Sequence, residues 1–538
     1  MRLSPGIFAT GCFAVAASAV AGLWMMLGAS VTMPVTPFGP GDKLNCISYA
    51  PFRHAQSPLD GPMTASREQI DEDLTRLSRM SRCIRTYSVD FGLDQVPELA
   101  QRHGLKVIQG LWLSSHADRN AYQIETAVAL ANRFPDVIEA VVVGNETLLR
   151  GEMSGNDVAA TIRAVKARVP VPVTYADVWE FWLRFPQLYD AVDFITIHIL
   201  PYWEDVPIAA PQAAAHVDAI RRKVAAVYPG KDILIGEVGW PSAGRMRAGA
   251  EPSPSNQALV VQEVLALAKR ENYRVNIIEA FDQPWKRRLE GTVGGYWGLF
   301  DDASRAPKFV WGQPVSDHPH FILQAIIGVI LAGAVFAAAL PARRRDDPPR
   351  GRDWLAVTAI AVAGGVLSGW AMADATYESL GAGGWLRSLT LCFVAVVAPP
   401  LASAAILARR PIPSFASILA DTGRMQPLVR LVYGITLIAL TVLAVQVALG
   451  LVFDPRYKDF PFAALSAATA PVFIHGLFAS ARGSGARGTA ECVAAAVLAL
   501  AVVYIVPNEG LANWQSLWMC GALAALALTL VRVRGAPD

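Results

Sequence analysis

The sequence is poor in charge. Only 17% of its 538 residues are charged, whereas 53% are hydrophobic. This balance is too apolar for a wholly soluble protein, so part of the chain is expected to lie in lipid. The net charge of +2 is the difference between 47 basic and 45 acidic residues, and it gives no overall field that would attract a polyanion. We therefore expect no nucleic-acid partner.

The six cysteines and eight histidines lack the spacings of metal or redox centres. Neither Cys-x-x-Cys nor His-x-x-x-His occurs, so we predict no metal and no cofactor. Cys46 and Cys83 fall in two expected neighbouring strands, where a disulfide would be permitted on an exported domain. Two buried free thiols are the preferred prediction, because a sequence pattern does not establish disulfide geometry. The other cysteines lie in apolar stretches at Cys12, Cys392, Cys492 and Cys520.

Long uncharged runs divide the chain. Residues 6–27 carry no charge, and this run exceeds the ~7–15 residues of a signal-peptide core. We predict an uncleaved anchor over residues 1–30, with a cleaved signal peptide as the alternative. From residue 319 to 538 we predict an all-α polytopic membrane domain of about seven helices, which makes about eight spans in all. Its apolar segments are 321–340, 354–372, 389–407, 431–453, 462–478, 490–506 and 514–531.

Arginine placement predicts the topology. If the N-terminus is cytoplasmic, every loop expected inside is arginine-rich, whereas the other loops hold only Arg387, Arg456 and Lys458 near their edges. We therefore expect a multi-pass protein of the bacterial inner membrane, with the lipid bilayer as a partner and residues 30–318 in the periplasm. The arginines expected inside are Arg2, Arg343, Arg344, Arg345, Arg350, Arg352, Arg409, Arg410, Arg424, Arg430, Arg482, Arg487, Arg532 and Arg534.

Residues 41–318 have the pattern of a soluble α/β domain. Short β-branched runs alternate with helix-like stretches such as 66–81 and 124–134. About eight βα units in under 300 residues favour a (β/α)8 TIM barrel, with its chemistry at the C-terminal strand ends. A doubly wound open sheet is the alternative, but no glycine-rich phosphate loop follows the first strand. The expected strands are 44–50, 83–87, 105–111, 138–143, 171–175, 194–199, 233–235 and 275–281.

Two glutamates follow expected strands at the same rim of this barrel. Glu146 comes after the strand at 138–143, and Glu237 comes after the strand at 233–235. Either glutamate alone could be a solvated or salt-bridged rim residue. Together they suit glycosidic chemistry, in which one carboxyl group protonates the leaving oxygen and the other attacks the anomeric carbon. A separation of ~5–5.5 Å is expected for a retaining enzyme.

Residues 43–312 resemble glycoside hydrolase family 17, the β-1,3-glucanases and glucanosyltransferases. The segment from Gly236 to Ser242 is the most specific match and resembles the nucleophile motif of the family. The other matching motifs are Arg85-x-Tyr87, Gly144-Asn145-Glu146, Pro201-Tyr202-Trp203, Glu279 to Lys286, and Tyr296 to Asp301.

The resemblance implies that Glu146 is the acid/base and Glu237 the nucleophile. Arg85 would favour the ionised form of Glu237, and Asn145 would bind the 2-hydroxyl of the sugar. His198 stands where other family members often carry asparagine, so it is expected beside the sugar subsites, with an ordinary strand histidine as the alternative. Aromatic rings can bind the C–H faces of sugars, although barrel packing is their alternative role. The remaining expected substrate-binding residues are Tyr49, Tyr87, Tyr202, Trp203, Glu279, Trp285 and Lys286.

The sequence does not choose directly between water and a sugar as the acceptor. The link between a compact barrel and a polytopic domain favours transfer, and the architecture resembles rhizobial membrane-bound β-(1,6)-glucan synthase proteins. We expect a β-1,3/β-1,6-glucan transglycosylase acting on β-glucan or gluco-oligosaccharides made by a separate glucan synthase. An endo-β-1,3-glucanase is one alternative. A non-catalytic glucan-binding assembly or transport protein is another, but few ionisable residues besides His475 lie in the expected spans, which argues against coupled transport.

Overall fold

The computed structural model describes residues 5–53, 56–61, 63–344, 346–420, 427–478 and 488–533. Its contacts divide the chain into two compact units. The barrel unit comprises residues 31–244 and 249–315, and the helical unit comprises residues 1–30, 245–248 and 316–538. Six of the arginines used for the topology prediction lie outside the described residues: Arg2, Arg345, Arg424, Arg482, Arg487 and Arg534.

The barrel unit is a closed ring of eight parallel strands, which confirms the predicted TIM barrel. The strands follow one another in chain order around the ring, and β1 pairs with β8 to close it. The sequence predicted each strand to within a few residues. The strands are β1 Cys46–Ser48, β2 Cys83–Arg85, β3 Lys106–Leu111, β4 Ile138–Asn145, β5 Val173–Val178, β6 Ile195–His198, β7 Ile233–Val238 and β8 Arg274–Ile277.

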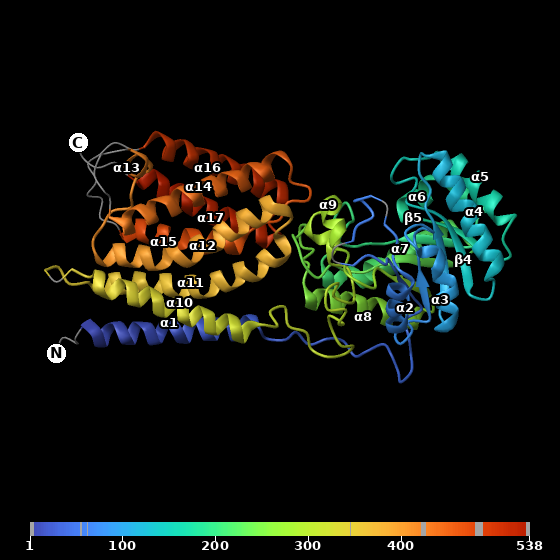
Figure 1. The fold of residues 1–538 in the computed structure, drawn as a ribbon, viewed down its shortest axis with the longest axis horizontal. Helices are drawn as coiled ribbons and strands as arrows, with labels where there is room; N and C mark the ends of the chain where they lie inside the picture. The colour runs from blue at the N-terminus through green and yellow to red at the C-terminus, as the bar shows by residue number, and fades with distance from the viewer. Residues whose placement is uncertain are drawn as a thin grey trace. The chain divides into compact units, whose positions relative to one another are not determined.

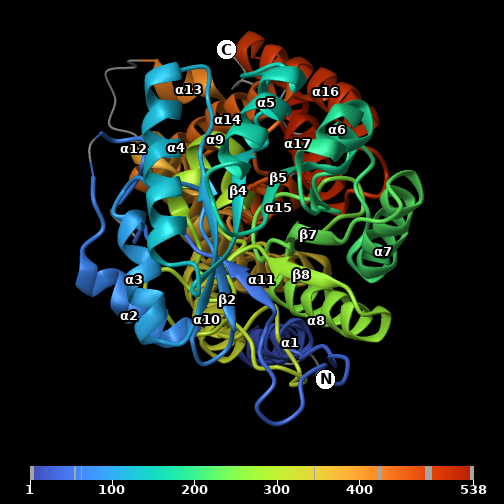
Figure 2. The same ribbon diagram turned by 90° about the vertical axis from the view of Figure 1, so that its right-hand side faces the viewer.

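Helices surround these strands, as Figure 2 shows for the barrel unit. Each longer helix buries an apolar face on the ring; α2, for example, buries Ile70, Leu74 and Leu77. Serine hydroxyls at Ser66 and Ser154 cap the N-termini of α2 and α5. The main helices of this unit are α2 Arg67–Leu77, α3 Val96–Arg102, α4 Ala117–Arg133, α5 Gly155–Lys166, α6 Trp179–Arg184, α7 Ala210–Val227 and α8 Pro254–Glu271, and a short α9 spans Arg287–Glu290.

Cys46 and Cys83 form a disulfide, so the preferred prediction of two free thiols was wrong. The parallel register pairs Ile47 with Ile84, which places the two cysteines opposite each other at the start of β1 and β2. Their Cα atoms are 4.4 Å apart, within the range that a disulfide can bridge. Both side chains belong to a small buried cluster that also contains Ile108, Ala140 and Leu234.

The ladder between strands is irregular close to the ends that carry the predicted site. The register shifts between Val142 and Asn145 on β4, and between Ile197 and His198 on β6. After the second shift, His198 lies opposite Glu237 on β7. Such irregularities are common near active sites, where they redirect side chains.

The helical unit contains seven helices that are long and apolar enough to cross a membrane, counted over the described residues. The prediction was about eight spans. The difference is α15, which has 17 residues and an internal Pro471. Figure 1 labels the helices of this unit: α1 Pro5–Leu27, α10 Phe321–Ala342, α11 Gly351–Glu378, α12 Gly381–Leu407, α13 Phe415–Leu419, α14 Leu428–Phe453, α15 Phe462–Phe478, α16 Thr489–Glu509 and α17 Trp514–Arg532.

Small residues allow close packing in this unit. A Cβ atom on Gly328 of α10 would collide with the backbone of Gly365 on α11. His475 is buried and makes two hydrogen bonds, one with the Tyr433 hydroxyl and one with the Arg410 carbonyl, both at 2.9 Å. These contacts fit a packing role for this histidine.

Candidate active site

The C-terminal ends of β4, β6 and β7 bring three titratable side chains together. Nδ1 of His198 lies 2.7 Å from Oε1 of Glu146, and Nε2 of the same ring lies 3.5 Å from Oε1 of Glu237. The contributing atoms of the three residues all lie within 4.8 Å of one another. The two rim glutamates therefore face one site, as the sequence predicted, and a histidine connects them.

The backbone that presents Glu146 is unusual. Glu146 has a φ of +52° and Gly144 has a φ of +91°, so the chain turns twice through left-handed conformations at the end of β4. This region is uncommon for residues other than glycine and is tolerated where surrounding contacts fix it. The Glu146 N–H donates to the Ala176 carbonyl at 2.8 Å, which ties the turn to β5.

Two further residues of β5 hold the chain just after Glu146. The Tyr175 hydroxyl accepts a hydrogen bond from the Leu148 N–H at 3.0 Å and donates to the Asp177 carboxylate. Asp177 also accepts from the Leu149 N–H at 3.4 Å. Burial and the nearby Glu146 charge raise the pKa of Asp177 to about 6, against the opposing effect of these hydrogen bonds.

Arg85 lies beneath the carboxylates and makes contacts in several directions. The residue is 1% exposed. Nη1 donates to the Gly236 carbonyl at 2.6 Å and lies 3.4 Å from Oε1 of Glu237. Nη2 donates to Oδ1 of Asn145 at 2.5 Å. The guanidinium therefore orients Asn145 and supplies positive charge beside Glu237.

Gly236 makes room for this arrangement. A Cβ atom there would collide with the Thr196 side chain, and it would lie 3.2 Å from the His198 ring and 3.3 Å from Nη1 of Arg85. Glycine before the β7 glutamate thus lets the arginine and the histidine approach that strand. Its carbonyl also accepts a hydrogen bond from Nδ2 of Asn276 at 2.7 Å.

A second charge pair, between the buried Glu279 and the partly buried Lys286, lies beyond the end of β8. Nζ of Lys286 contacts both carboxylate oxygens of Glu279, at 2.8 and 2.9 Å. Burial raises the pKa of Glu279 despite the opposing lysine charge. Burial also raises the pKa of Glu290 to about 7, and the charges of Glu279, Glu146 and Glu237 contribute in the same direction. The charges of Glu146 and Glu237 therefore act on this neighbouring group of residues.

The protonation of Glu146 follows from its contacts. Burial by itself raises the pKa of this carboxyl group. The hydrogen bond from His198 and the positive charges of His198, Arg150 and Arg85 outweigh burial, so the net pKa lies below its ordinary value. These contacts favour the form of Glu146 that accepts a proton.

The cluster of Glu146, His198 and Glu237 has the residue types of a metal site, but its surroundings oppose a cation. The Arg85 guanidinium lies 3.3 Å from Nε2 of His198 and 3.4 Å from Oε1 of Glu237, two of the three potential ligand atoms. A divalent ion there would have to overcome this neighbouring positive charge. We therefore assign no metal to the cluster.

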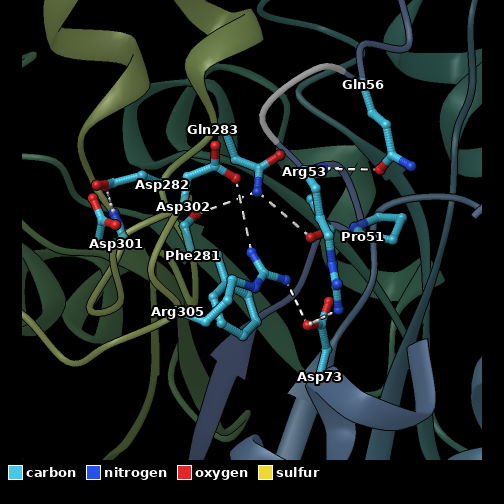
Figure 3. A network of polar contacts seen from close by, with 12 residues as sticks. Pro51, Arg53, Gln56, Asp73, Phe281, Asp282, Gln283, Asp301, Asp302 and Arg305 are labelled. Carbon is cyan, nitrogen blue, oxygen red and sulfur yellow. Dashed lines mark hydrogen bonds and ion pairs between the residues drawn. The ribbon is translucent and has the colours of Figure 1, made fainter. Parts of the chain in front are cut away.

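Tyr49, for which the sequence suggested a substrate-binding role, directs its hydroxyl toward α2. Its side chain is fully buried, and its hydroxyl donates to Asp73 of α2 at 3.0 Å. The Asp73 carboxylate also accepts hydrogen bonds from Arg53, at 3.1 Å, and from Arg305, at 2.5 Å (Figure 3). The Arg305 guanidinium lies over the Phe281 ring. Tyr49 is thus part of a polar network that joins the ends of β1 and β8 to α2.

Tyr202 is also fully buried. Its ring packs edge-on against Trp203, Trp240 and Trp297, with centroid separations of 4.9, 6.1 and 6.2 Å. This is the barrel-packing alternative considered for such aromatic residues. Trp203 is partly exposed.

The other two predicted aromatic residues are partly exposed at strand ends. Tyr87 donates from its hydroxyl to Ser48 at 2.8 Å, and the Arg85 guanidinium lies over its ring at 4.8 Å. Trp285 donates from Nε1 to Gln283 at 2.8 Å and packs edge-on against Phe52. Both rings retain some exposed surface.

Sequence reasoning missed Asn276, Asp177 and Glu290. Asn276 and Asp177 are fully buried polar residues in strands, a type that needs partners and often marks a site. Asn276 lies in the expected strand 275–281, which was a usable signal, whereas Asp177 lies two residues beyond the expected strand 171–175. Glu290 lies beyond the last strand, on the short helix α9, and no strand-end pattern could have identified it.

Comparisons with known proteins find relatives of the barrel unit. Residues 46–298 match the model of the BtgE/BtgC glycoside hydrolase domain. A relative from Neosartorya fischeri named "Probable beta-glucosidase btgE" is 29% identical over 225 residues, which cover 40% of this chain and 40% of the relative. A "Glucan 1,3-beta-glucosidase" from Arthroderma benhamiae is 26% identical over 257 residues, covering 45% of this chain and 83% of the relative.

Among solved structures, a glycoside hydrolase family 17 β-1,3-glucanosyltransferase from Rhizomucor miehei is 24% identical, with a TM-score of 0.43. The match covers 49% of this chain and 95% of that one. This chain spans about two-fifths of the length of the btgE relatives. Residues 46–298 therefore form a glycosidase-like enzyme domain, a glycoside hydrolase domain like that of the BtgE/BtgC proteins.

Proposed function

We propose that this protein is a membrane-anchored, retaining β-glucan-active enzyme, with Glu146 as the acid/base and Glu237 as the nucleophile. The observation that carries this proposal is the short separation of the two carboxylates at the rim of a glycoside hydrolase barrel. One oxygen of each lies within 4.8 Å of the other. Retaining enzymes place their carboxyl groups ~5–5.5 Å apart, whereas inverting enzymes need ~6.5–9.5 Å to admit a water molecule.

In the first step, the Glu237 carboxylate attacks the anomeric carbon while Glu146 gives its proton to the departing glycosidic oxygen. The Arg85 guanidinium lies 3.4 Å from Oε1 of Glu237 and orients that carboxylate for attack. Asn145 is buried next to Glu146 and is held by Arg85 at 2.5 Å. Its amide is thereby oriented to bind the 2-hydroxyl of the sugar, an interaction that strengthens toward the transition state.

In the second step, an acceptor hydroxyl attacks the glycosyl-enzyme and gives its proton to Glu146. We propose a sugar acceptor, so that the enzyme transfers, branches or remodels β-1,3/β-1,6-glucan supplied by a separate glucan synthase. The names of relatives such as "Glucan 1,3-beta-glucosidase" support a β-1,3-linked donor. The chain also joins its barrel to several apolar helices, which a freely secreted degradative enzyme would not need. The 1,6 linkage rests on the architectural resemblance alone.

For location, we propose the bacterial inner membrane with the barrel at the periplasmic face. Seven apolar helices support a multi-pass protein. The orientation is supported by the arginine-rich loops, which fall on the same side as the N-terminus in the predicted topology. The relatives named above are fungal, so the orientation needs a direct test.

The test of the enzyme proposal is Glu237→Gln in the full-length protein, assayed on a laminari-oligosaccharide. Loss of the nucleophile should lower the rate by about a thousandfold or more. Glu139→Gln is a matched control, because Glu139 lies on β4 but is exposed. Unchanged turnover in Glu237→Gln would contradict the proposal and favour a glucan-binding protein without catalysis.

Product analysis of the wild-type protein tests the choice of acceptor. Transfer predicts oligosaccharides longer than the substrate, and linkage analysis then identifies the bond formed. An endo-β-1,3-glucanase would give only shorter products. That result would leave the catalytic pair in place but would overturn the transfer assignment.

A further inference from the structure

Trp112 is a large aromatic residue that remains open at the rim of the barrel. It directly follows β3 and is 37% exposed. It lies outside the buried hydrophobic clusters, and among the described residues no other aromatic ring packs against it. Tyr49 and Tyr202, by contrast, are fully buried. A single exposed apolar side chain is ordinary on a protein surface, so the surroundings of Trp112 decide whether it has a role.

The register of the strands places Trp112 at the level of the catalytic turn. β3 and β4 are neighbours, and Leu111 at the end of β3 pairs with Val143 on β4. Trp112 is the next residue on its strand, as Gly144 is on β4, and Glu146 follows two residues later. Both side chains therefore leave the C-terminal ends of their strands, where the chemistry of such barrels takes place.

Arg150 joins the two strand ends and supports the indole ring. Its Nη2 donates to the Leu113 carbonyl at 2.9 Å, and its Nη1 donates to the Asn145 carbonyl. Nε and Nη2 also contact the Glu152 carboxylate, at 3.1 and 3.2 Å. The Cζ atom of the guanidinium held in this way lies 4.1 Å from the centroid of the Trp112 ring, in the geometry of a cation–π contact. It covers one face of the indole, so a ligand would meet the other face.

The backbone of Trp112 is also fixed. Its N–H donates to Oε1 of Gln123 at 3.0 Å, and the Val89 N–H donates to the same oxygen at 3.2 Å. Gln123 is 2% exposed, and its Nε2 donates to Asp90 at 2.6 Å. A buried side chain of α4 thus ties the end of β3 to the segment after β2. A ring that is already held in place loses little conformational freedom when a ligand stacks on it.

The order of the strands places Trp112 on the side of the leaving sugar. Three strands separate β3 from β7 in either direction around the closed ring, so Trp112 and Glu237 lie across the barrel from each other, and Glu146 is on the strand next to β3. In a retaining reaction the nucleophile attacks from the face opposite the leaving oxygen, and the acid/base carboxyl group lies beside that oxygen. A surface beyond Glu146, away from Glu237, therefore meets the sugar that leaves in the first step and the acceptor that replaces it in the second.

We propose that Trp112, supported by Arg150, is the platform on which the acceptor sugar stacks. This proposal rests on the proposed function, because it assigns the acceptor side of the same site. The C–H face of a glucosyl ring is apolar and packs on a flat aromatic surface. The hydroxyl oxygen of the bound acceptor then forms a bond to the anomeric carbon while the bond from that carbon to Glu237 breaks. The electron pair of the broken bond returns to Glu237, and the acceptor proton passes to Glu146, which gave up its own proton in the first step.

The test separates the two steps with β-laminaribiosyl fluoride as the donor and laminaritriose as the acceptor. The value of kcat/KM for fluoride release reports the first step, and fluoride is too small a leaving group to stack on the indole. Chromatography gives the ratio of the transfer product to the product of water attack. In the full-length protein, Trp112→Ala should raise the acceptor concentration at which the two products are equal by about tenfold. The kcat/KM for fluoride release should stay at the wild-type value.

Three further variants distinguish stacking from structural support. Trp112→Phe keeps a flat ring and should stay within about threefold of the wild-type acceptor concentration. Trp112→Leu keeps apolar bulk without a ring and should behave like Trp112→Ala. Trp385→Ala is the matched control, because Trp385 on α12 is an exposed tryptophan of the helical unit. It should leave both measurements unchanged.

The two measurements also identify failure. An unchanged product ratio in Trp112→Ala would overturn the platform. A fall in kcat/KM for fluoride release as large as the change in product ratio would overturn it too, because Trp112 would then act only by holding Arg150 against the Asn145 carbonyl. A wild-type protein that releases no fluoride, or that forms no transfer product, would instead overturn the proposed function.

Discussion

At the scale of single residues, the site consists of oppositely charged side chains that are paired and hydrogen-bonded to one another. Glu146 and Glu237 contribute negative charge, and Arg85 contributes positive charge between their strands. His198 completes the link from Arg85 to Glu146. Buried charges are stable only when paired and hydrogen-bonded. The same contacts that make these buried charges tolerable also hold each side chain in position.

Asp177 gives a prediction about stability and pH. Burial raises its pKa from 3.8 to about 6. Below pH 4 the carboxyl group is neutral in both the folded and unfolded states. Between pH 4 and 6 it ionises in the unfolded chain but resists ionisation in the folded one, so stability falls as the pH rises. Above pH 6 this decrease in the free energy of unfolding is complete, and it amounts to at most about 3 kcal/mol.

Asp177→Asn should remove this pH-dependent loss, because the amide does not titrate. We expect the difference in melting temperature, variant minus wild type, to increase between pH 4 and 6 and to stay level above that range. Thermal unfolding in detergent at several pH values measures it. The absolute difference also includes hydrogen bonds altered by the amide, so the trend is the informative quantity. A difference independent of pH would contradict the raised pKa.

The sequence predicted the residues of the site unevenly, for a reason visible on β1. Successive strand residues point to opposite faces. Ser48 accepts hydrogen bonds from Tyr87 and Asn276 inside the barrel, so the next residue, Tyr49, points outward to Asp73. Counting strand positions could have excluded Tyr49. Tyr202 follows the end of β6, where the alternation of side chains along a strand no longer applies. Its burial depends on packing against distant segments of the chain.

At the scale of elements, the register of β1 against β2 explains why the sequence did not predict the disulfide between Cys46 and Cys83. The order of the strands was predictable from their alternation with helices. The register was not, because buried parallel strands are apolar on both faces. A shift of one residue would have separated Cys46 from Cys83. The network of Asp73 and Arg305 shows the same limit, since its members are 232 positions apart and meet only when the barrel closes.

The disulfide should stabilise the barrel substantially. It closes a loop with a sequence separation of 37, and the loop-entropy model gives about 4 kcal/mol for this length. The double variant Cys46→Ala, Cys83→Ala should therefore lower the melting temperature of the barrel by roughly 10 °C. Cys12→Ala, Cys392→Ala is the matched control, because both of these cysteines are free. Calorimetry under non-reducing conditions measures the effect, and equal melting of both double variants would refute it.

At the scale of the whole molecule, composition predicted a barrel followed by a region of apolar helices, and the structure has both. An apolar helical unit is suited to lipid, whereas a mixed α/β unit is suited to water. The change in composition near residue 319 separates the two units in the sequence. The number of spans was less certain, because α15 is apolar but has only 17 residues. At 1.5 Å per residue it extends about 26 Å, slightly less than the ~30 Å hydrocarbon core.

The orientation proposed from the arginines can be tested on intact cells. Asp118 on α4 and Pro348 between α10 and α11 are both exposed. A cytoplasmic N-terminus places position 118 outside the membrane and position 348 inside it. In a background with Cys12, Cys392, Cys492 and Cys520 replaced by alanine, a membrane-impermeant maleimide should label Asp118→Cys in cells with a permeabilised outer envelope. Pro348→Cys should react only after lysis. The reverse pattern would put the glycoside hydrolase domain on the cytoplasmic side, where exported glucan could not reach it.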